Sequence, residues 1–204
     1  MQRKYISDFE IGLDEAGRGP LIGRVYAGAV IWGEDISDNK IINDSKKLSA
    51  KKRAIALEWI KSNVLAWGVG FAEHDEIDKI NILEATKLAM DRAIIDLKNK
   101  YKNNDENELN ILIIDGCGWE KKFTDYNVTS IVKGDSKYLS IAAASIIAKE
   151  HHDEYIKNLC EKNQGLDEKY GLLKNMGYGT KKHLDGIKKH GICEYHRKSY
   201  KCCV

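Results

Sequence analysis

Two apolar, β-branched runs flank a glycine-rich septet near the start of the chain, and this arrangement constrains the fold more than any other feature. Residues 6–13 and 25–32 each have the composition of a strand. The septet after the first run is Asp14-Glu15-Ala16-Gly17-Arg18-Gly19-Pro20, and it contains the only proline of the chain. Proline fixes its own φ and keeps the preceding residue out of the helical region. We therefore expect two antiparallel strands joined by a rigid loop.

The septet carries groups suited to phosphate chemistry. Asp14 and Glu15 follow directly at the end of the first predicted strand, and carboxylate oxygens are the ligands that Mg²⁺ and similar cations prefer. The turn Gly17-Arg18-Gly19 adds backbone N–H groups and a guanidinium that can bind phosphate. A dinucleotide-binding fingerprint is excluded, because Ile22 stands in place of its third glycine and a strand rather than a helix follows. The combination favours cleavage of a phosphodiester.

The rest of the chain alternates helical and strand patterns, which is typical of one α/β domain over residues 1–204. One helix is expected to follow the N-cap Ser49, and another to begin at Asn81, whose spacing to Glu84 resembles a capping box. The expected core positions of the second helix are Leu83, Leu88, Ile94, Ile95 and Leu97. Helices are thus predicted at 49–63, 81–101, 138–163 and 180–189, strands at 64–71, 111–114 and 127–132, and a surface loop at 102–110.

Composition and charge restrict the class of protein. A net charge of +2, from 33 basic and 31 acidic residues, does not by itself identify a nucleic-acid binder. Basic residues gather between 174 and 201, where they fit either contact with a phosphate backbone or a solvated helix face. The most continuous apolar stretch, 141–148, is too short to span a bilayer, and no signal peptide is recognised.

Cysteine usage favours a reduced, cytoplasmic protein. The five cysteines are an odd number, scattered along the chain without a C-x-x-C pair. A zinc site is disfavoured, because the spacing of the candidate ligands matches no common finger. Those candidates are His190, Cys193, His196, Cys202 and Cys203.

Four carboxylates stand at predicted strand ends or helix entries: Asp14, Glu15, Asp115 and Asp135. Asp115 ends the apolar run 111–114, which is typical of a strand buried on both faces. Hydrolysis of a phosphodiester with two divalent ions needs several carboxylates at one place, and four are enough. Each of them taken alone also fits an ordinary turn or helix cap.

Eight ordered segments of the sequence resemble motifs of the type 2 ribonucleases H, bacterial ribonuclease HII in particular. They extend along almost the whole chain, and the order of the motifs is the same. The segments are GLDEAGRGPL (12–21), NDSKKLS (43–49), NILEAT (81–86), IDG (114–116), VKGDS (132–136), SIAAASIIAK (140–149), GYGT (177–180) followed by His183, and HRKS (196–199).

The resemblance implies a ribonuclease H-like α/β fold, in which helices flank a central mixed β-sheet and a helical C-terminal segment, about 165–204, completes the substrate groove. It implies an endonuclease that cuts RNA in RNA–DNA hybrids and nicks 5′ to single ribonucleotides in duplex DNA, leaving 3′-hydroxyl and 5′-phosphate ends. Such an enzyme acts in ribonucleotide excision and RNA primer removal during replication and repair. By the same resemblance, two divalent ions, Mn²⁺ or Mg²⁺, are bound by the catalytic residues Asp14, Glu15, Asp115 and Asp135.

The resemblance also implies roles in substrate binding. The turn Gly17-Arg18-Gly19 is expected to contact the 2′-hydroxyl, the group that distinguishes RNA from DNA locally. Tyr178 is expected to pack on the sugar beside the cut, although a tyrosine between glycines is also often simply half-buried. Since the 2′-hydroxyl is recognised and is not a nucleophile, His183 and His196 are expected to be structural or positioning residues. Candidate contacts to backbone phosphates are Ser45, Lys46, Lys47, Lys133, Lys181 and Arg197.

Some positions depart from the usual pattern of that family. Arg24 replaces a proline, His152 replaces an arginine, and Cys117 follows the Asp-Gly pair in place of an asparagine. These departures affect the details of substrate contact, and none removes a carboxylate.

Two other functions remain as alternatives. Ribonuclease HIII cuts hybrids but handles isolated ribonucleotides poorly, and it is disfavoured by Tyr178 and by the lack of an extra domain before the first motif. A non-catalytic hybrid-binding protein is disfavoured because all four carboxylates are present. We expect a monomer whose partners are RNA–DNA hybrids and ribonucleotide-containing duplex DNA, and not a membrane.

Overall fold

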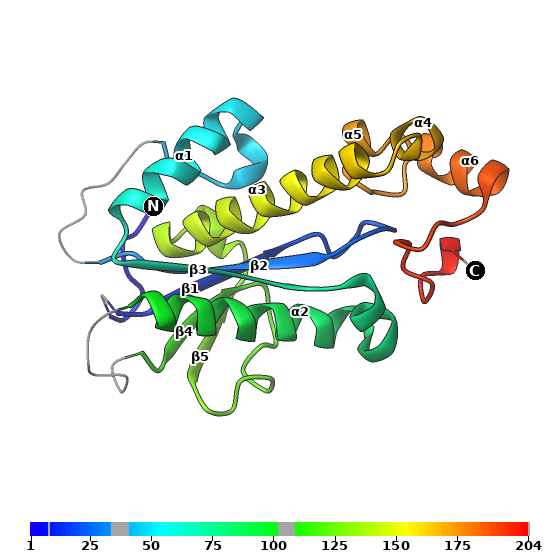
Figure 1. Cartoon of the computed structure of the whole chain (residues 1–204). Coiled ribbons are helices and arrows are strands. Elements are labelled where there is room, and N and C mark those ends of the chain that lie inside the picture. Colours follow the sequence, from blue (N-terminus) through cyan, green and yellow to red (C-terminus); the bar gives the residue numbers. More distant parts are fainter. Residues whose placement is uncertain (8, 34–40, 102–108, 204) are drawn as a thin grey trace.

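The computed structural model describes residues 1–7, 9–33, 41–101 and 109–203. Within these residues a five-stranded mixed sheet lies between two layers of helices, which confirms the predicted architecture (Figure 1). The strands are β1 (Ile11–Ala16), β2 (Val25–Ile31), β3 (Ala66–Ala72), β4 (Ile111–Asp115) and β5 (Asn127–Ile131), in the order β3-β2-β1-β4-β5. Neighbouring strands β1, β2 and β3 pair antiparallel, whereas β4 and β5 continue the sheet parallel to β1.

Glycines in the strands allow two long helices to approach the sheet from opposite faces. A Cβ added to Gly28 of β2 would lie 2.3 Å from the backbone oxygen of Ala144, in α3 (Leu139–Lys162). On the other face, one added to Gly70 of β3 would lie 2.2 Å from the backbone oxygen of Ala89, in α2 (His74–Lys100). Real Cβ atoms do not come so close to backbone, so these strand positions require glycine. The run of alanines in α3 packs against the face of the sheet on which α3 lies.

The first strand begins later and ends later than predicted. It does not include residues 6 and 7, and Asp8 of the predicted strand lies outside the described residues. The buried carboxylate of Glu10 instead accepts backbone N–H groups from Tyr5, Ile6 and Ser7 at 2.6–3.1 Å, which curls this segment into a turn. Because β1 continues to Ala16, both carboxylates of the septet lie within the strand rather than after it.

Helix α2, in contrast, begins earlier than predicted. Asn81 has φ of 67°, and its side chain accepts the backbone N–H groups of Leu83 and Glu84, so it caps a helical segment as predicted. The reciprocal contact of the predicted capping box is not seen among the described residues, and the Glu84 carboxylate pairs with Lys122 instead. The helix nevertheless extends upstream across this kink to His74, where Glu73 and Glu76 form a reciprocal capping box. The prediction that Leu83 and Ile95 are core residues is wrong: they are 39% and 58% exposed, because the helical period places Ala89, Met90 and Ala93 on the buried face instead. Of the remaining predicted core positions, Ile94 and Leu97 are buried and Leu88 is partly buried against the core.

The remaining predicted helices are found within one residue of their expected ends. They are α1 (Ala50–Asn63), capped by Ser49, α3, and α6 (Lys181–His190). Two short helices between α3 and α6 were not predicted: α4 (Leu166–Tyr170) and α5 (Leu172–Asn175). Left-handed residues bound both, Gly165 and Gly171 for α4 and Gly171 and Met176 for α5, and both helices are too short to show a helical period. Most of the predicted 102–110 loop lies outside the described residues.

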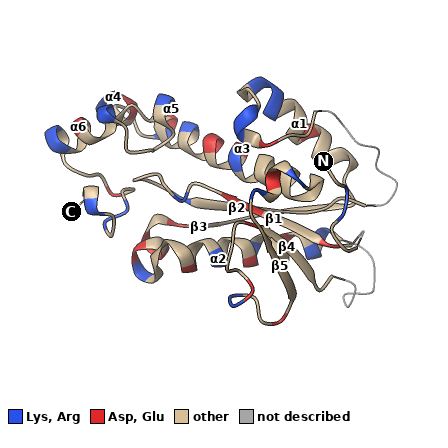
Figure 2. Ribbon diagram, turned by 180° about the vertical axis from the view of Figure 1, so that it is seen from behind, with Lys and Arg blue, Asp and Glu red and all other residues tan. Residues whose placement is uncertain are grey.

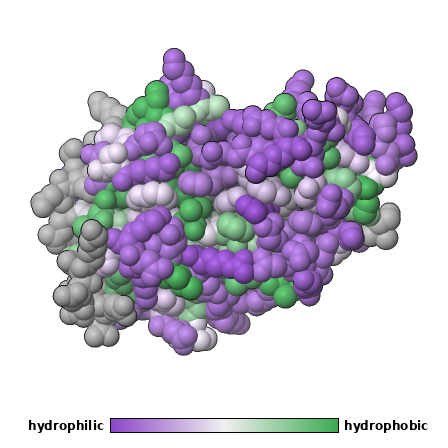
Figure 3. Space-filling view, viewed as in Figure 1, coloured by the Kyte–Doolittle hydropathy of each residue, from purple (hydrophilic) through white to green (hydrophobic). Residues whose placement is uncertain are grey.

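The surface separates the charges unevenly. Lysines and arginines are frequent on α4, α5, α6 and the segment that follows them (Figure 2). The face seen in Figure 3 is mostly hydrophilic, with hydrophobic side chains in small separate groups. No helix among the described residues is long and apolar enough to cross a membrane. All five cysteines are described, and none forms a disulfide.

Candidate active site

Strand pairing brings the four predicted carboxylates to one edge of the sheet. In the parallel pair of β1 and β4, Leu13 stands opposite Ile114, so Asp14 and Asp115 emerge side by side. The carboxylate of Asp115 accepts the backbone N–H of Gly134 at 2.7 Å, which fixes the 3₁₀ turn η3 (Gly134–Ser136) and with it Asp135. Glu15 follows Asp14 on β1. Groups from three separate parts of the chain therefore meet here.

The carboxylates are crowded and poorly hydrated. Burial and then the charges of Glu15 and Asp115 raise the pKa of Asp14 well above its ordinary value. Burial also raises the pKa of Glu15, against the opposing charge of Arg18, whose guanidinium donates to Glu15 at 3.1 Å. The pKa of Asp135 is raised by burial and by the charges of Asp115 and Asp44. The pKa values of these three carboxylic acids are thus raised by burial and by their negative neighbours.

This set of residues fits a divalent cation. The donors are hard carboxylate oxygens, and the second oxygen of Glu15 is buried without a hydrogen-bond partner among the described residues. The same part of the chain contains no group of three His, Cys, Asp or Glu side chains already arranged to hold a metal ion. That finding also covers the histidines and cysteines near the C-terminus.

Removal of divalent cations should destabilise the protein more at about pH 8 than at about pH 5. Because the folded-state pKa values of Asp14, Glu15 and Asp135 are raised, the stability that these groups contribute is present at low pH and is lost as pH rises through those pKa values. A cation offsets the repulsion only when the carboxylates are ionised. Melting temperatures measured with EDTA and with Mg²⁺ at the two pH values test this. An equal increase in melting temperature on adding Mg²⁺ at both pH values would contradict the prediction. In the Asp14→Asn variant, Mg²⁺ should increase the melting temperature by less than in the parent.

Lys46 lies between two cavities of the site. One, of about 330 Å³, is lined by Asp115, Asp135 and Lys133 among others, and the other, of about 240 Å³, by the Gly17–Gly19 turn and Tyr178. Lys46 lines both. Partial burial alone lowers the pKa of Lys46, but the nearby carboxylates outweigh it and the pKa is raised. Its ammonium group is therefore charged beside both the carboxylates and the turn.

Replacing Lys46 with methionine should lower kcat/KM for a cleavable nucleic acid about tenfold, because a charge-assisted contact to phosphate is lost. Steady-state kinetics on a labelled substrate measure this. Lys52→Met, on the exposed start of α1, is the matched control and should stay within about twofold. Equal losses in both variants would show that only general electrostatic attraction is involved.

The second cavity is formed where the glycine turn meets the C-terminal part of the chain. Gly17 has φ of 90°, and a Cβ on Gly19 would approach the Tyr178 ring to 3.1 Å. Tyr178 is 43% exposed, so its ring is available to the cavity. Arg18 also lines this cavity and is held by Glu15. The turn predicted to recognise ribose thus adjoins the carboxylates.

A ribonuclease HII family model matches residues 11–203. The chain belongs to the ribonuclease HII family. It is therefore a ribonuclease H, a hydrolase that cuts within the RNA of RNA–DNA hybrids. Ribonuclease HII of Rickettsia akari (strain Hartford) is 48% identical to it over 205 residues, which covers 99% of this chain and 96% of the relative.

Two solved structures of ribonucleases H share the fold. The ribonuclease HII in the PCNA complex from Archaeoglobus fulgidus is 25% identical with a TM-score of 0.70, covering 94% of this chain and 95% of that chain. Bst-RNase HIII in complex with Mn²⁺ has a TM-score of 0.73 at 21% identity, covering 95% of this chain and 67% of that chain. The second likeness concerns the fold alone. Both confirm the predicted ribonuclease H-like architecture.

Four of the six predicted phosphate contacts fall into two groups within this ribonuclease HII fold. Lys46, Lys47 and Lys133 line the carboxylate cavity, whereas Lys181 lies apart from it, beside a separate surface pocket at the start of α6. The Ser45 hydroxyl is buried and hydrogen-bonded to Ser145 at 2.8 Å, so it anchors the loop to α3.

The prediction that Arg197 contacts a substrate phosphate is wrong. Its side chain has no exposed surface and donates only within the protein, to backbone carbonyls and the Tyr200 hydroxyl. The predicted structural role of two histidines agrees with the geometry, because His183 and His196 are buried with their Nε2 atoms 3.1 Å apart.

Three residues of the site had been given no role from the sequence. Ser145 and Lys149 line the cavity that contains Tyr178, from one face of α3, and Asp44 lines the cavity that contains Asp115 and Asp135. The spacing of four between Ser145 and Lys149, within a small-residue helix, is the signal that could have identified them. Asp44 directly precedes Ser45 in a motif segment, but it also caps the 3₁₀ turn η1 (Ser45–Lys47), so its local pattern indicates a cap.

Two of the three departures from the family pattern, Arg24 and His152, have structural explanations. Arg24 pairs with Glu73 and its guanidinium lies over the rings of Phe71 and Tyr155, at 4.1 and 4.6 Å from their centroids. It lines a larger cavity of about 530 Å³ that contains none of the four carboxylates, so size alone does not identify the active site. His152 is fully buried, and a Cβ on Gly17 would lie 2.5 Å from its ring. His152 thus supports the glycine turn from beneath. Nothing in the structure explains Cys117, which is exposed.

Proposed function

We propose that this chain nicks duplex DNA 5′ to single embedded ribonucleotides, in addition to cutting RNA–DNA hybrids, and leaves 3′-hydroxyl and 5′-phosphate ends. The observation that supports it best is the adjacency of two cavities that share Lys46, one lined by carboxylates and one by the Gly17–Gly19 turn. A scissile phosphate at the first and its neighbouring ribose at the second are within reach of one bound strand. Ribonucleotide excision and primer removal are the cellular tasks such an activity serves.

The four carboxylates would hold two divalent ions, Mg²⁺ or Mn²⁺. When bound, such ions activate the attacking water and stabilise the leaving oxygen. Asp14, Glu15, Asp115 and Asp135 carry the ligand oxygens, and Gly134 orients Asp115 through its backbone N–H. Lys46 adds positive charge next to the phosphate. Burial of Asp14 and Asp135 in a poorly hydrated site strengthens each of these electrostatic contacts.

Recognition of the ribose is assigned to the other cavity. The backbone and guanidinium of the Gly17-Arg18-Gly19 turn contact the 2′-hydroxyl, and Tyr178 packs on the adjacent sugar. Residues 165–204 complete the groove, since Tyr178 closes one side of this cavity. The protein would act as a monomer with a single domain. Lys47 and Lys133 contact backbone phosphates and set the register of the duplex.

The placement of Tyr178 favours this function over the hybrid-restricted activity expected of a ribonuclease HIII. Its ring stands beside the glycine turn. At this position the protein would distinguish the ribose of a single ribonucleotide from the deoxyribose of the nucleotide next to it.

Cleavage of a labelled DNA duplex that contains one ribonucleotide tests the proposal. The duplex is incubated with Mg²⁺ or Mn²⁺, beside an all-DNA duplex and a long RNA–DNA hybrid. One cut 5′ to the ribonucleotide, with a 3′-hydroxyl that a polymerase can extend, is the expected result. Cleavage of the long hybrid alone would support the ribonuclease HIII-like alternative and reject the proposal.

A further inference from the structure

Arg197 uses every N–H of its guanidinium inside the protein. The side chain is fully buried, and among the described residues it forms no ion pair with a carboxylate. An arginine has five such donors, and all five are occupied. The acceptors are the carbonyl oxygens of Gly17 (2.6 Å), Arg18 (3.0 Å), Gly23 (2.9 Å) and Arg24 (2.9 Å) and the hydroxyl of Tyr200 (3.0 Å).

This contact determines which way the peptide groups of the glycine turn point. No described peptide bond is cis, and in a trans peptide the C=O and the following N–H point in opposite directions. Because the carbonyls of Gly17 and Arg18 point inward to Arg197, the N–H groups of Arg18 and Gly19 point away from it. Neither N–H has an acceptor among the described residues, and both residues line the cavity that contains Tyr178. Two free donors are therefore held towards the expected position of the ribose.

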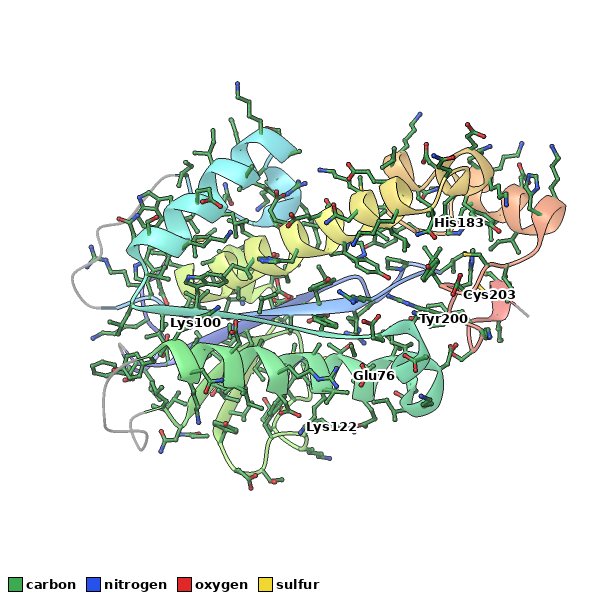
Figure 4. All side chains as sticks on the ribbon, viewed as in Figure 1. Glu76, Lys100, Lys122, His183, Tyr200 and Cys203 are labelled. Carbon is green, nitrogen blue, oxygen red and sulfur yellow. The ribbon has the colours of Figure 1, made fainter. Side chains whose placement is uncertain are left out.

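Arg197 belongs to a segment that is itself anchored firmly. We call residues 193–203 the C-terminal strap. Its Tyr200 hydroxyl donates to the Arg18 carbonyl at 2.7 Å, and the Asp78 carboxylate of α2 accepts the backbone N–H groups of Lys198 and Ser199. Figure 4 shows Tyr200 and Cys203 on this strap, beside the start of α2. The strap therefore connects the glycine turn to the first part of α2, which lies on the face of the sheet opposite α3.

Only a guanidinium satisfies this arrangement. Lysine has three donors on a flexible stem and cannot reach four carbonyls spread around one plane. A neutral side chain would leave buried carbonyls without partners. The turn would then lose the constraint on its peptide orientation while the surrounding sheet and helices stayed in place.

We infer that Arg197 is a positioning residue for ribose recognition: through the carbonyls of the glycine turn it fixes the two outward N–H groups that read the 2′-hydroxyl. The inference rests on the proposed function, because it assumes that this turn reads ribose. It replaces the phosphate contact expected from the sequence with an indirect role in specificity.

The test is a pair of dissociation constants, measured for a duplex with one ribonucleotide and for the matched all-DNA duplex. Both are measured in an Asp115→Asn background with Mg²⁺, so that no cleavage occurs. Arg197→Lys should reduce the ratio of the two affinities about tenfold and leave the all-DNA affinity within about twofold. Tyr200→Phe, which removes one donor from the Arg18 carbonyl, should reduce the ratio by a smaller factor. Cys202→Ser, on the exposed side of the strap, is the control.

Each outcome has a distinct meaning. If the parent binds both duplexes equally, the proposed function fails before the role of Arg197 is reached. If the parent discriminates and Arg197→Lys discriminates equally well, the inference is wrong. A parallel fall in both affinities would show a general structural role and would also overturn it. Should Arg197→Lys not fold, an unchanged ratio in Tyr200→Phe decides against the inference.

Discussion

Replacing Asp115 with asparagine is expected to lower cleavage of RNA by at least about a thousandfold. The substitution keeps the size of the side chain and leaves one oxygen to accept the Gly134 N–H, so η3 should stay in place. What is lost is a negative charge at the point where β1 and β4 bring Asp14 and Asp115 together. Single-turnover kinetics on a labelled hybrid, with the variant in excess, give the rate of the chemical step.

The control for Asp115→Asn is Asp75→Asn, which removes an exposed carboxylate that pairs with Lys79 on the surface of α2. It should retain activity within about twofold. The Asp115 variant should melt no lower than the parent when cations are absent, because it relieves repulsion around Asp14, whose pKa the Asp115 charge helps to raise. Residual activity within about tenfold of the parent would remove Asp115 from the catalytic set.

The largest loss of stability from one added methyl group is expected at a strand glycine such as Gly28. Alanine there would place its Cβ 2.3 Å from the Ala144 backbone oxygen, and a helix backbone cannot move aside as a side chain tip can. We expect Gly28→Ala to lower the free energy of unfolding by about 2–3 kcal/mol, even though alanine is intrinsically better than glycine in a strand. Urea denaturation of the two proteins measures the difference.

Gly179→Ala is the matched control for Gly28→Ala. Its new methyl would meet only the Leu21 side chain, at 3.3 Å, and Leu21 can adjust. This variant should change the free energy of unfolding by less than about 1 kcal/mol. A similar loss in both variants would mean that α3 can shift on the sheet, and that close approach of the helix is not what glycine provides at position 28.

Local signals in the sequence were sufficient for most elements. Ser49 caps α1 as predicted, and the apolar run before Asp115 is a strand whose residues 112–114 are fully buried. Asn81 shows the limit of such signals. It does cap a helical segment, but a capping box at Glu73 and Glu76 adds an upstream segment that joins it across a kink. Both caps can be recognised in the sequence, but no local pattern indicates that the two segments join into one helix.

The residues of the candidate site also differ in how well the sequence predicts their roles. Asp14, Glu15, Asp115 and Asp135 stand in motifs at the ends of strands, so their convergence could be expected from the family resemblance. Arg197 could not be assigned in this way. It lies among basic and polar residues, which is typical of a surface, and its burial depends on carbonyl groups far away in the chain. Backbone acceptors have no signature in a sequence, so a side chain that pairs with them resembles a free charge.

The position of β1 has a consequence for the order of folding. β1 and β2 form a local antiparallel pair, whereas the pairing of β1 with β4 joins residues 13 and 114 across α1, β3 and α2. Closing so long a loop costs more entropy than closing a hairpin, so the hairpin is favoured to form first. Asp14 and Asp115 therefore come together only after most of the chain is ordered. A partly folded molecule that contains only the hairpin lacks Asp115 beside Asp14, so we expect it not to cleave nucleic acid.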